Sequence, residues 1–270
     1  MPCISILDGF DGRIEENEKR GVIMKILAID TSTQVLSVAI LEDDQLIIET
    51  TKNTKETHGE RLMPTIEWAF ENSLFGIQEI DRIVIAHGPG SYTGLRIGVT
   101  TAKTLAWTLD KELVGLSSLQ VIAGQAGPTT SIIVPLFDAR RQNIYAGLYR
   151  CQKGQLQAVE ADQHSSAQEF AHYLKKTYSE ESFVLIGDDA ASFLDIFVSE
   201  LGDRVSLSCQ KNQLASAYLL GKMASDKEAE PVHTFVPHYL KLTEAEENWL
   251  EAHPEQGEEE YVQKTSRLDG

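Results

Sequence analysis

Long apolar runs are absent from this sequence. No stretch approaches the roughly 18 consecutive apolar residues that a membrane-spanning helix needs, and residues 1–23 mix charges without the apolar run of a signal peptide. Cysteine is scarce as well: Cys3, Cys151 and Cys209 are widely separated and lack metal-ligand spacing. An odd number of scattered cysteines suits a reducing compartment. We therefore expect a cytoplasmic protein without membrane contact.

Positive charge is the second shortage. The chain has 24 Lys and Arg against 41 Asp and Glu, a net charge of −17. Binding to a phosphate backbone depends on Lys and Arg, so we do not expect this chain to bind nucleic acid over a broad surface by itself. The acidic excess is greatest at the end, where residues 241–270 hold nine acids and three bases. We predict that 242–270 form an acidic tail, either simply solvated or binding a partner.

Three familiar chemical motifs are also missing. A glycine-rich segment runs from Gly88 to Gly98, but no Lys follows as a P-loop requires, and Thr93 occupies the third glycine position of a dinucleotide fingerprint. The chain has no Gly-x-Ser-x-Gly nucleophile elbow. Two interpretations of the segment remain open. It forms a phosphate-binding turn before a helix, or Gly94 and Gly98 permit close packing.

What the sequence does contain is a repeated order of strands and helices. Apolar patterning predicts three strands joined by short turns, then a helix at 57–73 that begins with a capping box of Thr57 and Glu60, then strand, helix and strand. A similar series follows. The first series has strands at 25–30, 35–41, 45–51, 82–86 and 112–116, with a second helix ending near 109. The second has strands at 131–137, 143–149, 155–160 and 182–186, and helices at 166–177, 190–200 and 212–224.

This order predicts an α/β fold of two similar subdomains, 24–130 and 131–241, like that of actin, Hsp70 and the sugar kinases. Residues 1–23 are expected to lie outside the fold. A purine-rich coding stretch is possible at Glu18–Gly21, just before Met24, so we expect Met24 to be the true start. A genuine short extension is the alternative.

Several segments resemble the TsaB (YeaZ) family, and together they cover residues 24 to about 241. They are 26–32 (ILAIDTS), the His58-x-x-Arg61-Leu62-Met63-Pro64 helix start, 88–98 (GPGSYTGLRIG), 138–141 (DARR) and 237–240 (PHYL). The resemblance implies a non-catalytic scaffold and activator of TsaD, the enzyme that forms threonylcarbamoyladenosine in tRNA beside the anticodon. It also implies that the ATPase TsaE docks on this pair and that tRNA binds only through the complex. A homodimer is left open.

The catalytic paralogue TsaD carries a His-x-x-x-His metal pair, and the resemblance places that pair on Ser118 and Ile122. Isoleucine cannot ligate a metal, so we expect no metal, no cofactor and no catalytic residue. Two alternatives are a small-molecule kinase of the actin-like superfamily and an M22-type metallopeptidase homologue. The missing histidine pair argues against the peptidase. The turn at Asp138–Arg141 lacks the glycine of a phosphate-binding turn, which argues against the kinase.

Two sets of candidate site residues follow. Weak candidates for nucleotide binding are Asp30, Thr31, Ser32, Gly88 and Gly90. A partner interface is expected on the helices at 57–73 and 93–109, as a four-helix contact, with inward packing of the same residues as the alternative. The interface candidates are His58, Leu62, Met63, Ile66, Phe70, Gly94, Gly98, Thr101 and Leu105.

Overall fold

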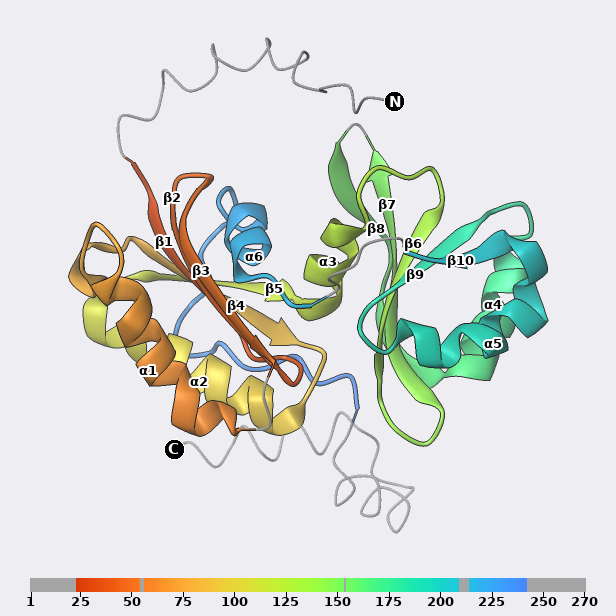
Figure 1. The fold of residues 1–270 in the computed structure, drawn as a ribbon, viewed down its shortest axis with the longest axis horizontal. Coiled ribbons are helices and arrows are strands. Elements are labelled where there is room, and N and C mark those ends of the chain that lie inside the picture. The colour runs from red at the N-terminus through yellow and green to blue at the C-terminus, as the bar shows by residue number, and fades with distance from the viewer. Residues whose placement is uncertain (1–22, 54–55, 153, 209–213, 242–270) are drawn as a thin grey trace, which may run out of the picture.

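The computed structural model describes residues 23–53, 56–152, 154–208 and 214–241. The predictions for the N-terminal extension and for the acidic tail at 242–270 concern segments outside these described residues. Figure 1 shows two α/β halves lying side by side, each built around one sheet. None of the described helices combines the length and the apolar character needed to cross a membrane.

The first sheet has the strand order β3-β2-β1-β4-β5. Its strands are β1 Lys25–Asp30, β2 Val35–Glu42, β3 Gln45–Asn53, β4 Arg82–Gly88 and β5 Glu112–Ser117. The first three are antiparallel, as predicted, and β4 and β5 run parallel to β1. Since helices cover both faces of the sheet, β1, β2 and β4 are buried along nearly their whole length rather than at alternate residues.

Side-chain alternation along β1 separates two cores. Leu27 and Ile29 face the helices α1, His58–Glu71, and α2, Tyr92–Leu109. Ile26 and Ala28 face α6, Ala217–Met223, on the opposite side. Ser91 caps α2 through its hydroxyl, which accepts the N–H of Gly94. The capping box predicted for α1 is wrong in its chemistry, because the Thr57 hydroxyl donates to the Glu60 carboxylate, 2.7 Å away, and caps no N–H.

The second half repeats the first, with strand order β10-β9-β6-β7-β8. Its elements are β6 Ile132–Asp138, β7 Asn143–Gln152, β8 Gln155–Ser166, α4 Ala167–Thr177, β9 Phe183–Ile186, α5 Ala190–Leu201 and β10 Val205–Leu207. Single 3-10 turns occupy Ile77–Glu79, Gly124–Ala126 and Gly202–Arg204. The prediction made β8 too short, at 155–160, and α6 too long, at 212–224. It missed β10 and the short helix α3, Ser118–Ala123, which contacts both sheets.

The chain finally returns to the first sheet. Ala217 and Leu220 of α6 join the core that contains Ile26, and Phe235 joins the core under α1 and α2. A return of this kind is invisible in the local apolar pattern, because both partners are far apart in sequence. The boundary at 130/131 stays a prediction, but α6 and the segment around Phe235 pack on the first half rather than the second.

Candidate functional site

The turn between β1 and β2 is built around a buried carboxyl group. Asp30 is only 1% exposed and accepts two hydrogen bonds from Ser32, from its backbone N–H at 2.9 Å and its hydroxyl at 2.7 Å. Burial raises the pKa of Asp30 to about 6, although the hydrogen bonds from Ser32 and the charge of His58 act in the opposite direction. The two hydrogen bonds from Ser32 hold the backbone of the turn between β1 and β2 against Asp30.

The glycine-rich loop packs tightly on this turn. The Ser91 N–H donates to the Ser32 carbonyl at 2.7 Å, and the Thr31 hydroxyl donates to the Gly94 carbonyl at 2.8 Å. A Cβ atom at Gly94 or Gly98 would collide with Thr31, so both positions require glycine for close approach. The close-packing interpretation of these two glycines is confirmed.

A cleft of about 760 Å³ lies between the two halves. It is lined mainly by the β1–β2 turn and the start of α2 on one side, and by the β6–β7 turn and the loop after β9 on the other. Of the five predicted nucleotide-binding residues, Ser32 and Gly90 line this cleft. Asp30, Thr31 and Gly88 lie behind its wall, with Gly88 directly against the backbone of His238. Nucleotide binding therefore stays a prediction, resting on two of those residues.

The opposite wall of the cleft holds an unusual turn. Arg140, Arg141 and Gln142 all have left-handed backbones, with φ of 69°, 54° and 63°. A left-handed backbone conformation costs a non-glycine residue on the order of 1 kcal/mol or more. Asp138 holds the turn by accepting the Arg140 N–H at 2.7 Å, and Asp189 accepts the Asp138 N–H at 2.9 Å.

Asp188 and Asp189 were not predicted to line this site. They follow β9 in a loop that the sequence alone does not bring near residue 138. Burial is the main cause that raises the pKa of Asp189, while the hydrogen bond from Asp138 lowers it. The only local signal for this loop was the pair of aspartates directly after Gly187. Gly187 itself has a φ of 128°, which marks a sharp turn.

The positions assigned to the paralogue's metal pair lie on α3. Ser118 and Ile122 are both buried, and Ile122 packs with Phe137 and Tyr149 in an apolar cluster between the halves. Within the described ranges, no group of three or more His, Cys, Asp and Glu residues could hold a metal ion.

A polar network next to α3 also joins the halves. Asp162 on β8 accepts hydrogen bonds from the Ser117 hydroxyl of the first half and from the Tyr149 hydroxyl, the latter at 2.6 Å. Burial raises the pKa of Asp162, and the hydrogen bonds from Ser117 and Tyr149 oppose that shift. The pKa of Tyr149 is raised by burial and by the neighbouring carboxylate.

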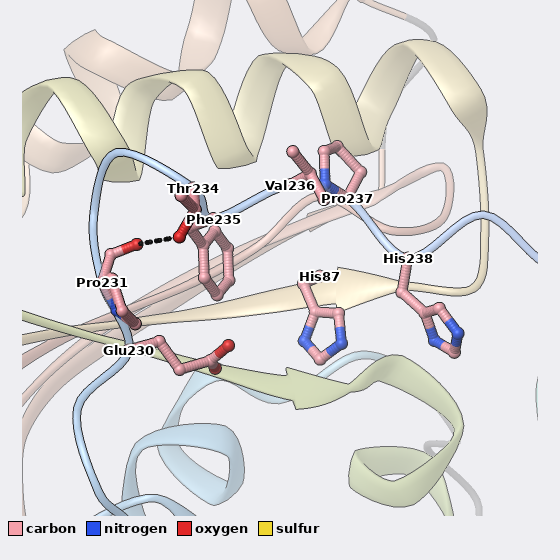
Figure 2. A pocket seen from close by; sticks show the side chains of 8 residues that line it. All are labelled: His87, Glu230, Pro231, Thr234, Phe235, Val236, Pro237 and His238. Carbon is pink, nitrogen blue, oxygen red and sulfur yellow. Dashed lines mark hydrogen bonds between the residues drawn. The ribbon is translucent and has the colours of Figure 1, made fainter. Parts of the chain in front are cut away.

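A second, smaller pocket of about 350 Å³ lies beside the end of β4 (Figure 2). Burial, and secondarily the nearby His238, lowers the pKa of His87 to about 4, so its ring is neutral at pH 7. The His87 carbonyl accepts the His238 N–H at 2.8 Å, while its ring Nδ1 is buried without a hydrogen-bond partner. His58 contacts the Thr33 carbonyl through Nε2 at 2.7 Å.

The predicted interface residues divide between core and surface. Leu62 and Ile66 lie in the core, and Gly94 and Gly98 are covered by Thr31, so these four are corrected to inward packing. The cause is helix geometry, which turns residues at 62, 66 and 69 toward the sheet and residue 63 away from it. His58, Phe70, Thr101 and Leu105 are half-buried.

Large apolar side chains nevertheless remain exposed on these two helices. Met63 and Trp68 on α1 are 48% and 45% exposed, and Trp107 on α2 is 69% exposed. Trp107 was not among the predicted residues, although its position on the outer flank of α2 could have been found from the helical period.

Each half has an antiparallel three-stranded meander extended by parallel strands, and the two halves face each other across a cleft. This arrangement defines the actin-like class of α/β proteins. A family model described as "TsaD: tRNA N6-adenosine threonylcarbamoyltransferase" matches residues 46–249. The tRNA threonylcarbamoyladenosine biosynthesis protein TsaB of Bacillus subtilis is 38% identical over 231 residues, 85% of this chain and 99% of that protein. The chain belongs to the TsaB family, as its sequence motifs predicted.

More distant relatives agree with this assignment. TsaB of Escherichia coli K12 is 26% identical over 78% of this chain and 94% of that protein. The structure of YeaZ from Pseudomonas aeruginosa has a TM-score of 0.67 at 22% identity, covering 80% of this chain and all of that one. At such identity the likeness shows the fold alone, and it confirms the predicted fold.

Proposed function

We propose that this chain is a non-catalytic subunit in the formation of threonylcarbamoyladenosine in tRNA, and that it binds and activates a TsaD-family transferase through α1 and α2. The role in this modification follows from membership of the TsaB family. The proposed binding surface rests on one observation. The outer face of the two helices is partly apolar, and along α2 it is almost free of charge.

That face differs in composition from the rest of the molecule. Charged residues make up 24% of the chain, yet from Ile97 to Leu109 the only one is Lys103. The exposed residues on this length of α2 are Thr100, Thr104, Trp107 and Thr108. Loss of charge together with exposed Met and Trp is typical of the centre of a protein interface. On α1, Met63 and Trp68 are also exposed, together with the acidic Glu60, Glu67 and Glu71.

The site chemistry supports a subunit without its own reaction. Ile122 offers no ligand atom where the paralogue's second histidine would fall, and it is fixed in an apolar cluster. The turn that holds Arg140 and Arg141 has no glycine at which a phosphate could approach bare backbone. Nothing in these residues favours the kinase or the metallopeptidase alternative.

Charge placed on the α1–α2 face tests the proposal. Met63→Glu and Leu105→Glu are expected to weaken binding of the host's purified TsaD-family protein by about 100-fold or more, because an unpaired charge buried in an interface costs several kcal/mol. Calorimetry measures the affinity and a thermal melt checks folding. Val198→Glu, at a similarly exposed apolar position on α5, is the matched control.

The outcomes separate clearly. Intact folding with lost binding in Met63→Glu supports the interface. Unchanged binding in both folded variants would place the transferase elsewhere. Docking of the ATPase TsaE on the assembled pair is a further part of the proposal, which mass measurement of the mixed proteins can test. A homodimer in the absence of the transferase stays open, and mass measurement of this chain alone tests it.

A further inference from the structure

The segment at residues 230–239, here called the strap, lies along the flank of α2. It follows α6 and covers the free edge of β5, where the Glu230 N–H donates to the Leu113 carbonyl at 2.8 Å and the Glu230 carboxylate accepts the Gly115 N–H at 3.0 Å. Figure 2 shows the strap running beside α2 and crossing the end of β4.

Contacts with two residues fasten the strap to the second half of α2. The Lys103 amine donates to the carbonyls of His233, at 3.1 Å, and Phe235, at 2.6 Å. The Trp107 ring meets the His233 ring edge-on, with centroids 6.1 Å apart.

Nearer the start of α2, Arg96 donates to the Tyr239 hydroxyl at 3.2 Å, and Tyr92 stacks on Tyr239 with centroids 4.8 Å apart. The strap is therefore fixed in place along most of the helix.

The exposed side of the strap has the same character as the outer face of α2. Residues 231–237 (PVHTFVP) contain no Asp, Glu, Lys or Arg, in a chain with a net charge of −17. Val236 is 66% exposed, and Trp107 beside the strap is 69% exposed. In Figure 2, Val236 lies on the side of the strap next to α2, whereas Phe235 and His87 point away from the helix into the pocket.

We infer that the strap is a second part of the transferase-binding surface, with Trp107 and Val236 as its anchors. This rests on the proposed function, because the occupant is the same TsaD-family protein, extended from α1 across α2 to the strap. The argument is one of continuity: the Lys103 amine is bound to strap carbonyls, so a surface without acids continues from Thr100 and Thr104 to Val236.

The character of this surface also selects the kind of partner. A nucleic acid would need exposed Lys and Arg, which residues 231–237 lack. A tryptophan and a valine surrounded by threonine and proline match the apolar core of a protein interface. The partner surface is therefore expected to be apolar at its centre.

Two substitutions test the inference, with the full chain and the host's purified TsaD-family protein. Trp107→Ala and Val236→Glu are each expected to weaken binding about tenfold or more, with melting temperatures near that of the unchanged chain. Tyr173→Ala and Val198→Glu are matched controls, because both residues are exposed apolar positions on α4 and α5 of the other half. Incorporating a photo-cross-linking phenylalanine at 236, and at 198 as its control, gives a measurement that does not depend on affinity.

Lost binding in both variants with a cross-link from 236 to the transferase supports the inference. If Val236→Glu binds within about twofold and 236 gives no cross-link, while Met63→Glu loses binding, the strap is outside the interface although the proposed function stands. If the folded Met63→Glu and Leu105→Glu variants also bind normally, the transferase binds elsewhere, and the α1–α2 surface of the proposed function fails together with the inference. A cross-link from 236 only to a second copy of this chain would overturn the inference in favour of self-association.

Discussion

At the scale of single residues, Asp30 shows how burial changes the meaning of an acid at the end of a strand. An aspartate at the end of the first strand of an actin-like fold is a candidate for phosphate or metal binding. Here the carboxyl group is fully enclosed and both hydrogen bonds come from Ser32. Because burial disfavours the charged form, the folded protein holds this proton more tightly than the unfolded chain does.

Replacing Asp30 with Asn is therefore expected to stabilise the fold at pH 7.5. The pKa of Asp30 rises from 3.8 to about 6 on folding, so its contribution to stability is favourable at low pH and is lost as the pH rises through about 6. An amide oxygen accepts the same two hydrogen bonds and the side chain never ionises. We expect a gain on the order of 2–3 kcal/mol at pH 7.5, disappearing below about pH 4.

Urea unfolding at pH 7.5 and pH 4 measures this difference. Asp203→Asn, at an exposed position, controls for the loss of one negative charge. If the Asp30→Asn variant is less stable than the original chain at pH 7.5, the fold stabilises the carboxylate and the burial argument is wrong.

Residue-scale features were only partly predictable from the sequence. The close packing of Gly94 and Gly98 could be anticipated because two glycines one helical turn apart admit a neighbour. Which side chains of α1 face outward could not be fixed as firmly, since Leu62 and Met63 are adjacent and both apolar. Only the position of the sheet decides that Leu62 is core and Met63 is surface.

At the scale of elements, α2 is held from both flanks, by α1 and by the strap. The strands and long helices were predicted because each carries its own apolar period. The strap has no such period, and its contacts with α2 join residues more than 100 positions apart. The helix α3 and the strand β10 were missed because six and three residues are too few for a recognisable pattern.

Lys103→Met tests how the strap is held. Methionine keeps much of the apolar stem but removes the hydrogen bonds to the His233 and Phe235 carbonyls. Hydrogen bonds to charged groups contribute about 1.5–3 kcal/mol, so we expect the melting temperature to fall by roughly 3–12 °C. Amide exchange should also quicken around 233–238.

Lys176→Met, an exposed substitution on α4, is the control for losing one positive charge. Slow exchange of the strap amides in Lys103→Met would mean that the packing of Phe235 in the core is enough to fix the segment without the lysine.

At the scale of the whole molecule, charge determines which partners the chain can meet alone. With −17 net charge and an α2 face almost free of charge, its surface repels phosphate and offers apolar contact to protein. The cleft does not reverse this, because Arg140 and Lys241 are accompanied there by Asp138, Asp188 and Asp189.

The isolated chain is therefore expected to leave tRNA unbound in a gel-shift assay at about 0.15 M salt, where surface charges more than about 8 Å apart are largely screened. Addition of the host's TsaD-family protein should produce a shifted complex that contains both proteins. Retardation of tRNA by this chain alone at that salt concentration would contradict the charge argument and would require a local basic site that the net charge conceals.

The return of α6 and the strap to the first half has a consequence for synthesis on the ribosome. The first sheet emerges early, yet α6 completes the cover of one of its faces, beside Val121 of α3, and Glu230 bonds to the free edge of β5. The roughly 100 residues between β5 and α6 take on the order of 5–20 s to translate. During that interval Ile26, Ala28 and Val84 lack their cover, so the nascent first half is a natural client for a chaperone. Since the strap is made after α1 and α2, the proposed transferase-binding surface would be complete only once residues 230–239 have been made.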